Sequence, residues 1–576
     1  MEPYGFLKKL NDNQKEICLS NDNFILTACP GSGKTRTITY RLAYLAQKNE
    51  SSNLFNIALT YTNRAADEIE TRLLDLGIDT SNIWTGTIHS FCLQFIIRPY
   101  ANYHSNLSKG YRIIDEYIRD EYIKNIAEEL KINGYIDDLR SNPLIREKYY
   151  ELLTKNKEID FDLILSYSYE LVSAHRFIAE NISHIIRSIH VDEFQDTNEA
   201  QYQILSCLIC ENPSINILFV GDTNQAIYTG LGGVAKTAKE IRDLYRVPFT
   251  EKCLDGCYRS TQRMVNLYTN FEVSPTGVFS VAEYKEQLGT FKYDNKIDKD
   301  DLVAKIAEIL RSELACGMPE NEICIVAPTW FKIFPFTNQL KRVMPEAEFD
   351  APDISPIKRD PLNVFYLISK LLFTQYSGRI TGRKRTATDI LNILHMDFGV
   401  LMPNYADNYL VLRAINATQA NQADGISTIK MAVKNLWHSL KISIEDYPLL
   451  KSTYRDFVDK IVSRIKQFDL SFDYVSMEKC FMERKGIVIN TIHGVKGEEY
   501  TTMIGFSLLH GVIPNWKITR ETICHDETCK LLYVMCSRAK KNLYLFSESG
   551  YFTRGYNPKP YTATNELKMC DFNYDI

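Results

Sequence analysis

The sequence lacks any apolar run near the roughly 20 residues that a helix needs to cross a bilayer. Its first residues, MEPYGFLKKL, lack the uninterrupted apolar stretch of a secretory signal. Basic charge is not in excess either, because the net charge is −5. We therefore expect a soluble cytoplasmic protein with no membrane partner. Any contact with a nucleic acid must come from a local groove rather than from the charge of the whole chain.

The fourteen cysteines show no pattern that would indicate disulfides. A zinc or iron–sulfur site would need four convergent ligands. No second matching pair accompanies Cys207 and Cys210, which lie at helical spacing. The same holds for Cys524, Cys529 and Cys536, which we expect to straddle a polar loop and a strand-like segment. Reduced thiols packed in the core are the favoured interpretation, and a metal cluster is the alternative.

What the chain does contain is an alternation of short β-branched runs with helical patterns, which is typical of a mostly parallel sheet. The runs lie at 24–29, 56–62, 188–194, 216–222, 323–329, 486–493, 503–507 and 542–547. We predict an α/β fold with two parallel-sheet domains, each carrying a mainly helical insertion. The expected ranges are 1–90 with 186–250 for the first domain, 91–185 for its insertion, 251–354 with 481–576 for the second domain, and 355–480 for its insertion.

The segment ACPGSGKTRT directly follows the first predicted strand and leads into a helical pattern. Gly31, Ser32 and Gly33 permit a tight loop whose backbone N–H groups face an anion. Lys34 would reach the β- and γ-phosphates of a nucleotide, and Thr35 would ligate Mg²⁺. Ala28 stands where this pattern usually has glycine, which alanine can do if its φ is negative. The alternative is a glycine turn with a chance lysine, but the order of strand, loop and helix favours a phosphate site.

A second segment, HVDEFQDTN, is acidic and lies at the end of another apolar strand. Asp192 would hold Mg²⁺, mostly through water, and Glu193 would orient and deprotonate an attacking water. An Asp-Glu pair is more often a solvated helix start. Its place at the end of an apolar strand favours the catalytic interpretation.

These two segments, together with VGDTNQAIY and VINTIHGVKGEEY in this order, resemble the UvrD/Rep/PcrA group of superfamily 1 DNA helicases. The resemblance covers nearly the whole chain except the second insertion. It implies two RecA-like domains that hydrolyse ATP with Mg²⁺ at their interface and move along single-stranded DNA or a tailed duplex. It also implies a polarity of 3′ to 5′.

The resemblance further implies roles for single residues. At the nucleotide, Gln14 in LNDNQ matches the adenine-reading glutamine, and Arg36 and Tyr258 match the pair that stacks on the base. Gln225 matches the γ-phosphate sensor, and Glu499 the ribose ligand. The two arginines expected from the second domain, because positive charge stabilises the transferring phosphoryl group, are Arg259 and Arg538. The residues implied at the DNA strand are Tyr61, Thr62, Asn63, Arg64, Thr87, His89, Tyr228 and His493.

The sequence departs from the family after Tyr228, where Thr229-Gly230-Leu231-Gly232-Gly233 lacks the expected tryptophan and arginine. This departure affects the expectation of strand separation, and not that of ATP hydrolysis or movement along DNA. One alternative is a motor subunit that gates a partner nuclease, similar to the helicase subunit of two-gene anti-phage systems such as Gabija. Another is a DNA-binding scaffold with a dead nucleotide site, which the intact Lys34, Asp192 and Glu193 argue against.

Overall fold

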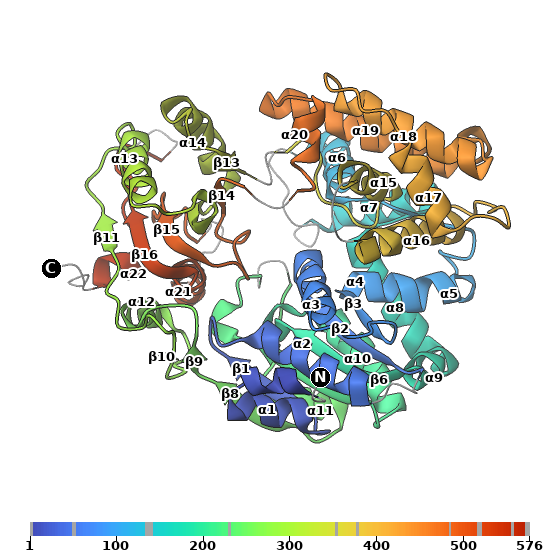
Figure 1. Ribbon diagram of the computed structural model, residues 1–576, viewed down its shortest axis with the longest axis horizontal. Helices are drawn as coiled ribbons and strands as arrows, with labels where there is room; N and C mark the ends of the chain where they lie inside the picture. The colour runs from blue at the N-terminus through green and yellow to red at the C-terminus, as the bar shows by residue number, and fades with distance from the viewer. Residues whose placement is uncertain are drawn as a thin grey trace.

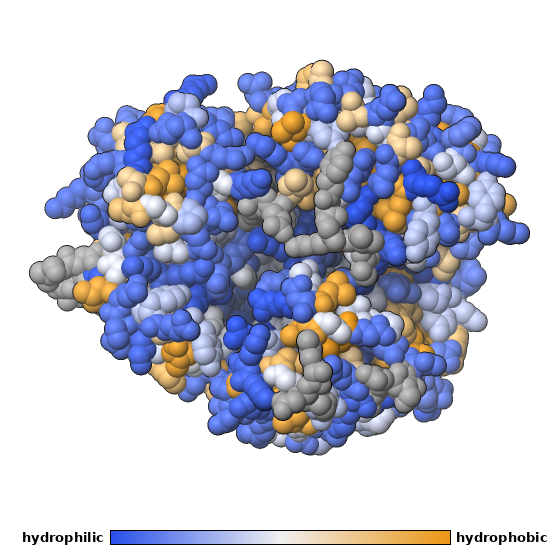
Figure 2. Space-filling view, viewed as in Figure 1, coloured by the Kyte–Doolittle hydropathy of each residue, from blue (hydrophilic) through white to orange (hydrophobic). Residues whose placement is uncertain are grey.

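The computed structural model describes residues 4–48, 53–132, 142–228, 232–351, 355–375, 380–482, 485–514, 521–553 and 558–570. Within these ranges the chain forms two six-stranded parallel sheets and two mainly helical regions, arranged around a central hollow (Figure 1, Figure 2). This confirms the predicted α/β fold class. None of the described helices is both long and apolar enough to cross a membrane.

The first sheet has the strand order β3-β2-β6-β7-β1-β8, and all neighbouring strands are parallel. Its strands are β1 (Phe24–Ala28), β2 (Phe55–Thr60), β3 (Ile83–Thr87), β6 (Ile186–Asp192), β7 (Asn216–Gly221) and β8 (Thr250–Leu254). The inner strands are buried on both faces, which explains their continuous apolar runs. Because all strands run the same way, their carboxyl ends and the loops that follow meet along one edge.

Helices cover both faces of this sheet. One face packs against α1 (Asp12–Leu19), α2 (Lys34–Lys48) and α3 (Asn63–Asp75), and the other against α10 (Glu199–Glu211) and α11 (Ala238–Tyr245). Cys207 and Cys210 lie on α10, as their helical spacing indicates.

The segment between β3 and β6 is mainly helical. It contains α4 (Ile88–Phe91), the π-helical η2 (Cys92–Ile97), α5 (Arg98–Tyr100), β4 (Arg112–Ile113), α6 (Glu116–Glu129), α7 (Pro143–Asn156), β5 (Glu158–Ile159), α8 (Phe161–Ala174) and α9 (Arg176–His184). Its two ends share the core of the first sheet, since Ile96, Leu171 and Ile178 belong to the same cluster as Ile189. Only α6 and α7 form a small core of their own.

The second sheet has the order β11-β16-β15-β12-β14-β13 and is also parallel. Its strands are β11 (Phe291–Asp294), β12 (Ile323–Ala327), β13 (Phe349–Asp350), β14 (Ile487–Thr491), β15 (Tyr500–Gly505) and β16 (Ala539–Phe546). The helices around it are α12 (Gln262–Tyr268), α13 (Leu302–Ala315), α14 (Trp330–Val343), α21 (Glu521–Cys536) and α22 (Asn565–Met569), beside a small pair of strands, β9 (Gly256–Cys257) and β10 (Phe279–Ser280). In both sheets the helical segment follows an edge strand, β3 or β13.

Cys524, Cys529 and Cys536 all lie on the single helix α21. Our interpretation of a polar loop followed by a strand is therefore wrong there. The polar residues between these cysteines belong to the helix, and Cys529 and Cys536 are buried.

The second helical region contains α15 (Val364–Phe373), α16 (Ile380–Met396), α17 (Asn408–Asn416), α18 (Gly425–Leu440), α19 (Pro448–Phe468) and α20 (Tyr474–Glu478). It has its own apolar core. It docks on the first helical segment through ion pairs: Arg98 donates twice to Asp397, at 2.6 Å each, and Arg112 donates to Asp456 at 2.9 Å. The second sheet lies on the other side of the hollow, at the left of Figure 1.

Candidate functional site at the seam of the two sheets

One continuous cleft separates the two sheets and runs on to the second helical region; the hollow it forms is visible in Figure 2. Lys34 and Glu193 line it from the first sheet, and Arg259 and Arg538 line it from the second. Lysine and arginine outnumber aspartate and glutamate in its lining by eighteen to eleven, although the whole chain has a net charge of −5. The cleft is therefore a local groove that favours anions.

The loop between β1 and α2 needs its glycines. Gly31 and Gly33 have φ of 72° and 85°, in the left-handed region that other residues rarely adopt. A side chain on Gly31 would also meet Cβ of Arg259 at 2.5 Å. The loop is tied to the second domain's chain, because the amide of Tyr258 donates to the Gly31 carbonyl at 2.8 Å. Ala28 ends β1 and is not among the residues with positive φ, so alanine fits there without strain.

The remaining loop residues complete an anion cradle. Ser32 is buried, and its hydroxyl donates to the Cys29 carbonyl at 2.8 Å. Lys34 and Thr35 begin α2 and line the cleft. The first amides of a helix have no partner inside the helix, so this end of α2 suits a bound phosphate.

Lys34 Nζ lies 3.2 Å from Glu193 Oε1. Burial would lower the pKa of Lys34, but Glu193, Asp222 and Asp192 together raise it. Burial would raise the pKa of Glu193, but Lys34, Lys496 and the hydrogen bond from Gln195 together lower it. Burial and the neighbouring Glu193 charge both raise the pKa of Asp192. A charged lysine and a charged carboxylate thus face each other at the end of β6.

Sequence reasoning missed Gln195, which holds this carboxylate, and Asp222, which holds Gln195. Gln195 Nε2 donates to Glu193 Oε2 at 2.5 Å, and the Gln195 side-chain oxygen accepts from the backbone amide of Asp222 at 3.0 Å. Glu193 has a left-handed φ of 54°, which is uncommon for a residue other than glycine. The sequence does contain a signal for them, because both residues lie just after apolar strands, in HVDEFQDTN and VGDTNQAIY.

Two further side chains, Arg538 and Lys496, make contacts across the seam between the sheets. Arg538 Nη2 donates to Gln225 Oε1 at 2.8 Å, and Gln225 Nε2 donates in turn to Asp222 Oδ2 at 2.7 Å. Lys496 pairs with the buried Asp196 and also donates to the Gln225 carbonyl. Burial and the neighbouring Arg259 lower the pKa of Arg538 to about 10, which leaves it charged near neutrality.

Arg259 and Glu499 form a pair within the second domain. Arg259 Nε donates to Glu499 Oε2 at 2.8 Å, and Arg259 Nη1 donates to the Ser537 carbonyl at 3.1 Å. Lys540 approaches the same carboxylate at 3.6 Å. Burial would raise the pKa of Glu499, but these cations lower it.

The three residues expected at the adenine surround the mouth of the loop. Gln14 is buried, and its Nε2 donates to the Ser32 carbonyl at 3.0 Å. Tyr258 is 41% exposed, and its hydroxyl accepts from Asn11 Nδ2 at 3.1 Å. Arg36 lines the cleft beside them.

Some of the residues expected at a DNA strand line the cleft, and the others lie outside its lining. Thr62, Asn63 and Arg64 line the cleft at the start of α3, where the Thr62 hydroxyl also caps the helix by accepting from the Ala65 amide at 3.2 Å. Tyr61 is stacked on Tyr228, with ring centroids 4.5 Å apart.

His493 lies against Tyr228 with ring centroids 5.7 Å apart. Tyr61, Tyr228 and His493 are not part of the cleft lining, and neither are Thr87 and His89. The Thr87 hydroxyl caps α4 by accepting from the Ser90 amide, and His89 packs edge-on against Phe161. Residues 229–231, where the departure after Tyr228 begins, lie outside the described residues.

No group of three or more metal-ligating side chains of the kind that could hold an ion by itself occurs among the described residues. A single carboxylate such as Asp192, with a hydroxyl such as Thr35, suits a cation that is held mainly by substrate phosphates and water.

Comparison with known proteins gives matches along most of the chain. The model of the UvrD/REP helicase N-terminal domain matches residues 10–146 and 140–245, and that of the UvrD-like helicase C-terminal domain matches residues 401–550. The chain is 24% identical to the ATP-dependent DNA helicase PcrA of Staphylococcus epidermidis, over 94% of this chain and 83% of the relative. It is 23% identical to the protein of the same name from Staphylococcus aureus, with the same two coverages.

Proposed function

Since the chain belongs to the UvrD/Rep family of helicases, we propose that it hydrolyses ATP in the cleft between its sheets and uses the cycle to move along DNA. The observation that carries this proposal is that Lys34 and Arg538, from opposite sheets, line one cleft. We take residues 1–90 with 186–250 and residues 251–354 with 481–576 as the two ATPase domains, except that residues 251–254 complete β8 and therefore belong to the first. The segments 91–185 and 355–480 are their insertions.

The triphosphate lies along the loop from Gly31 to Thr35, with Lys34 at the β- and γ-phosphates. Thr35 and Asp192 would hold Mg²⁺, which neutralises charge on the phosphate oxygens when it is bound. Gln14 reads the adenine edge, while Arg36 and Tyr258 stack on its faces. The hydrogen bond from Asn11 to the Tyr258 hydroxyl supports this assignment, because Asn11 caps the helix that holds Gln14.

Glu193 orients the attacking water and accepts its proton, and Gln195 fixes the carboxylate for that task. Arg259 and Arg538 stabilise the charge of the transferring phosphoryl group, while Gln225 links Arg538 to the first sheet. Arg259 must leave Glu499 to reach a phosphate. The same exchange would free the Glu499 carboxylate for the ribose hydroxyl.

The DNA strand passes over Tyr61, Thr62, Asn63 and Arg64. Tyr228 and His493, with Thr87 and His89, complete the set that the resemblance implies. Base stacking on tyrosine tolerates any sequence, as a motor requires. Closure of the cleft on ATP draws the DNA-binding residues of the two domains together, and hydrolysis lets them part. The strand advances because one domain keeps hold of it while the other moves.

The test compares ATPase rates with single-stranded DNA, blunt duplex DNA and single-stranded RNA, at low and high salt. Single-stranded DNA should stimulate most, and the stimulation should fall as salt rises. A better response to duplex or RNA would overturn the polymer assignment. Strand displacement on 3′-tailed and 5′-tailed duplexes tests the proposed 3′ to 5′ polarity, because only the 3′-tailed substrate should be opened.

A second candidate is a DNA-stimulated motor that gates a partner nuclease in an anti-phage complex, with weak unwinding of its own. The observation that favours it is the sequence Thr229-Gly230-Leu231-Gly232-Gly233, which offers neither a stacking tryptophan nor an arginine for phosphate. Strong ATPase stimulation without strand displacement on either tailed duplex would support this candidate over the first.

A further inference from the structure

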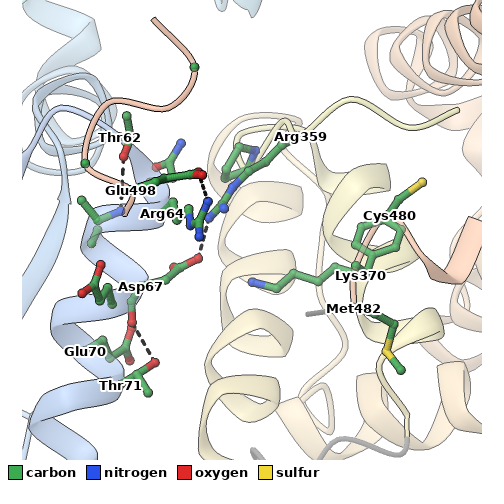
Figure 3. Close-up of a pocket in the computed structure, with 18 of the residues that line it drawn as sticks. Thr62, Arg64, Asp67, Glu70, Thr71, Arg359, Lys370, Cys480, Met482 and Glu498 are labelled. Carbon is green, nitrogen blue, oxygen red and sulfur yellow. Dashed lines mark hydrogen bonds and ion pairs between the residues drawn. The ribbon is translucent and has the colours of Figure 1, made fainter. Parts of the chain in front are cut away.

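Arg64, at the start of α3, is paired across the seam with Glu498, on the loop between β14 and β15 (Figure 3). The Arg64 side chain is 53% exposed, whereas the Glu498 side chain is only 10% exposed. The guanidinium thus reaches into the cleft while the carboxylate is held in its wall. Figure 3 shows Arg359 of the second helical region approaching the same point, paired there with Asp67 of α3.

Glu498 is fixed by more than this ion pair. The hydroxyl of Tyr500 donates to its other carboxylate oxygen. Its backbone carbonyl accepts from Arg538 Nη1 at 3.4 Å, and the next residue, Glu499, accepts from Arg259. The side chain of Glu498 therefore faces the strand side of the cleft, while its backbone contacts an arginine of the nucleotide side.

A guanidinium binds carboxylate and phosphate oxygens through the same donor geometry. We propose that Glu498 is a built-in competitor of the DNA phosphate for Arg64, and that a strand must displace it to bind. This rests on the proposed strand-binding role of Arg64. Displacement leaves a nearly buried carboxylate without its cation, so affinity for DNA is lower than Arg64 alone would give.

The variant that tests this is Glu498→Gln, which keeps the shape of the side chain and removes its charge. The probe is a fluorescently labelled oligo(dT), and its binding is followed by anisotropy without nucleotide. We expect Glu498→Gln to bind about fivefold more tightly than wild type, a coupling at the lower end of the usual range. In an Arg64→Ala background the same change should give no gain, because the contested cation is gone.

The matched control is Glu478→Gln, which removes another carboxylate from the lining of the same cleft. A gain of equal size in this control would overturn the proposal, because the effect would then come from the general field of the cleft. Equal or weaker binding by a folded Glu498→Gln, checked by its thermal melting, would overturn it as well. Wild type that fails to bind oligo(dT) would instead overturn the proposed function, and this inference with it.

Discussion

Arg538 and Gln225, 313 residues apart in sequence, are joined by a hydrogen bond of 2.8 Å between opposite sheets. Both side chains are only 1% exposed. Gln225 is tied to Asp222, and Asp222 to Gln195, which holds Glu193. The bond therefore connects an arginine of the second domain to the carboxylate of the first through an unbroken chain of contacts.

Arg538→Lys should lower the turnover number of the DNA-stimulated ATPase by about a hundredfold or more, the usual effect of losing such an arginine. A lysine keeps the charge but cannot reproduce the separate donors with which Arg538 reaches Gln225, Ser537 and Val534. Steady-state ATPase assays measure the effect, and Arg413→Lys, at an exposed position on α17, is the control. Unchanged turnover in the Arg538 variant would contradict the role assigned to this arginine.

Glu193→Gln should reduce turnover by roughly 10²- to 10⁴-fold, the contribution of a positioned general base. ATP should still bind, and the variant should remain on DNA in the ATP-bound state because hydrolysis cannot release it. Gln195→Ala should have a smaller effect, because Gln195 only fixes the carboxylate. Single-turnover hydrolysis and DNA retention in ATP measure the two properties. Wild-type turnover in Glu193→Gln would show that another group is the base.

Tyr61→Ala should weaken binding of oligo(dT) by about 1–3 kcal/mol, which is the contribution of one stacked base. Tyr169→Ala is a matched control, since the two tyrosines are 39% and 37% exposed and Tyr169 lies on α8. Anisotropy titrations measure both affinities. Equal losses in the two variants would rule out a specific stack at Tyr61.

The buried strands and the nucleotide loop were predictable because their signals are local. An apolar run followed by a glycine loop and a helix needs only neighbouring residues to be recognised. The edge strand β8 was missed, because Glu251 and Lys252 break the apolar pattern and only Leu254 is buried. Strand β11, also missed, has only one buried residue, Phe291.

Contacts between distant segments could not be predicted in the same way. The pair of Arg64 and Glu498 joins residues 434 positions apart, and neither residue has a neighbour that indicates the other. The docking of the second helical region on the first is likewise set by ion pairs rather than by a periodic pattern. The prediction also failed around Cys524, Cys529 and Cys536, because the polar residues fill the first turns of α21 and the apolar residues its last turns.

The stability of the fold should depend on pH through His89. Burial lowers the pKa of His89 from 6.5 to about 4. Between these two values the unfolded chain binds a proton that the folded chain does not, so the stability present above pH 6.5 is lost as the pH falls towards 4. The urea midpoint should therefore fall less between about pH 7.5 and about pH 5 in His89→Gln than in wild type. An equal fall in both proteins would contradict the burial of the neutral ring.

The contact of Arg98 with Asp397 should anchor the second helical region to the first. The two side chains are 14% and 10% exposed, and both hydrogen bonds are 2.6 Å long. Arg98→Met leaves a nearly buried carboxylate without its partner, which costs about 3–5 kcal/mol when such a pair is broken.

The double variant Arg98→Met/Asp397→Leu removes that unpaired charge and should recover most of the loss. Hydrogen exchange of α5 and of the carboxyl end of α16 reports the local opening. The pair of Arg112 and Asp456 still holds the two regions elsewhere, so the opening should stay local in both variants. Equally fast hydrogen exchange in the double and the single variant would contradict this prediction, because the contact would then act through packing rather than charge. In that case added salt would not change the rate of local opening.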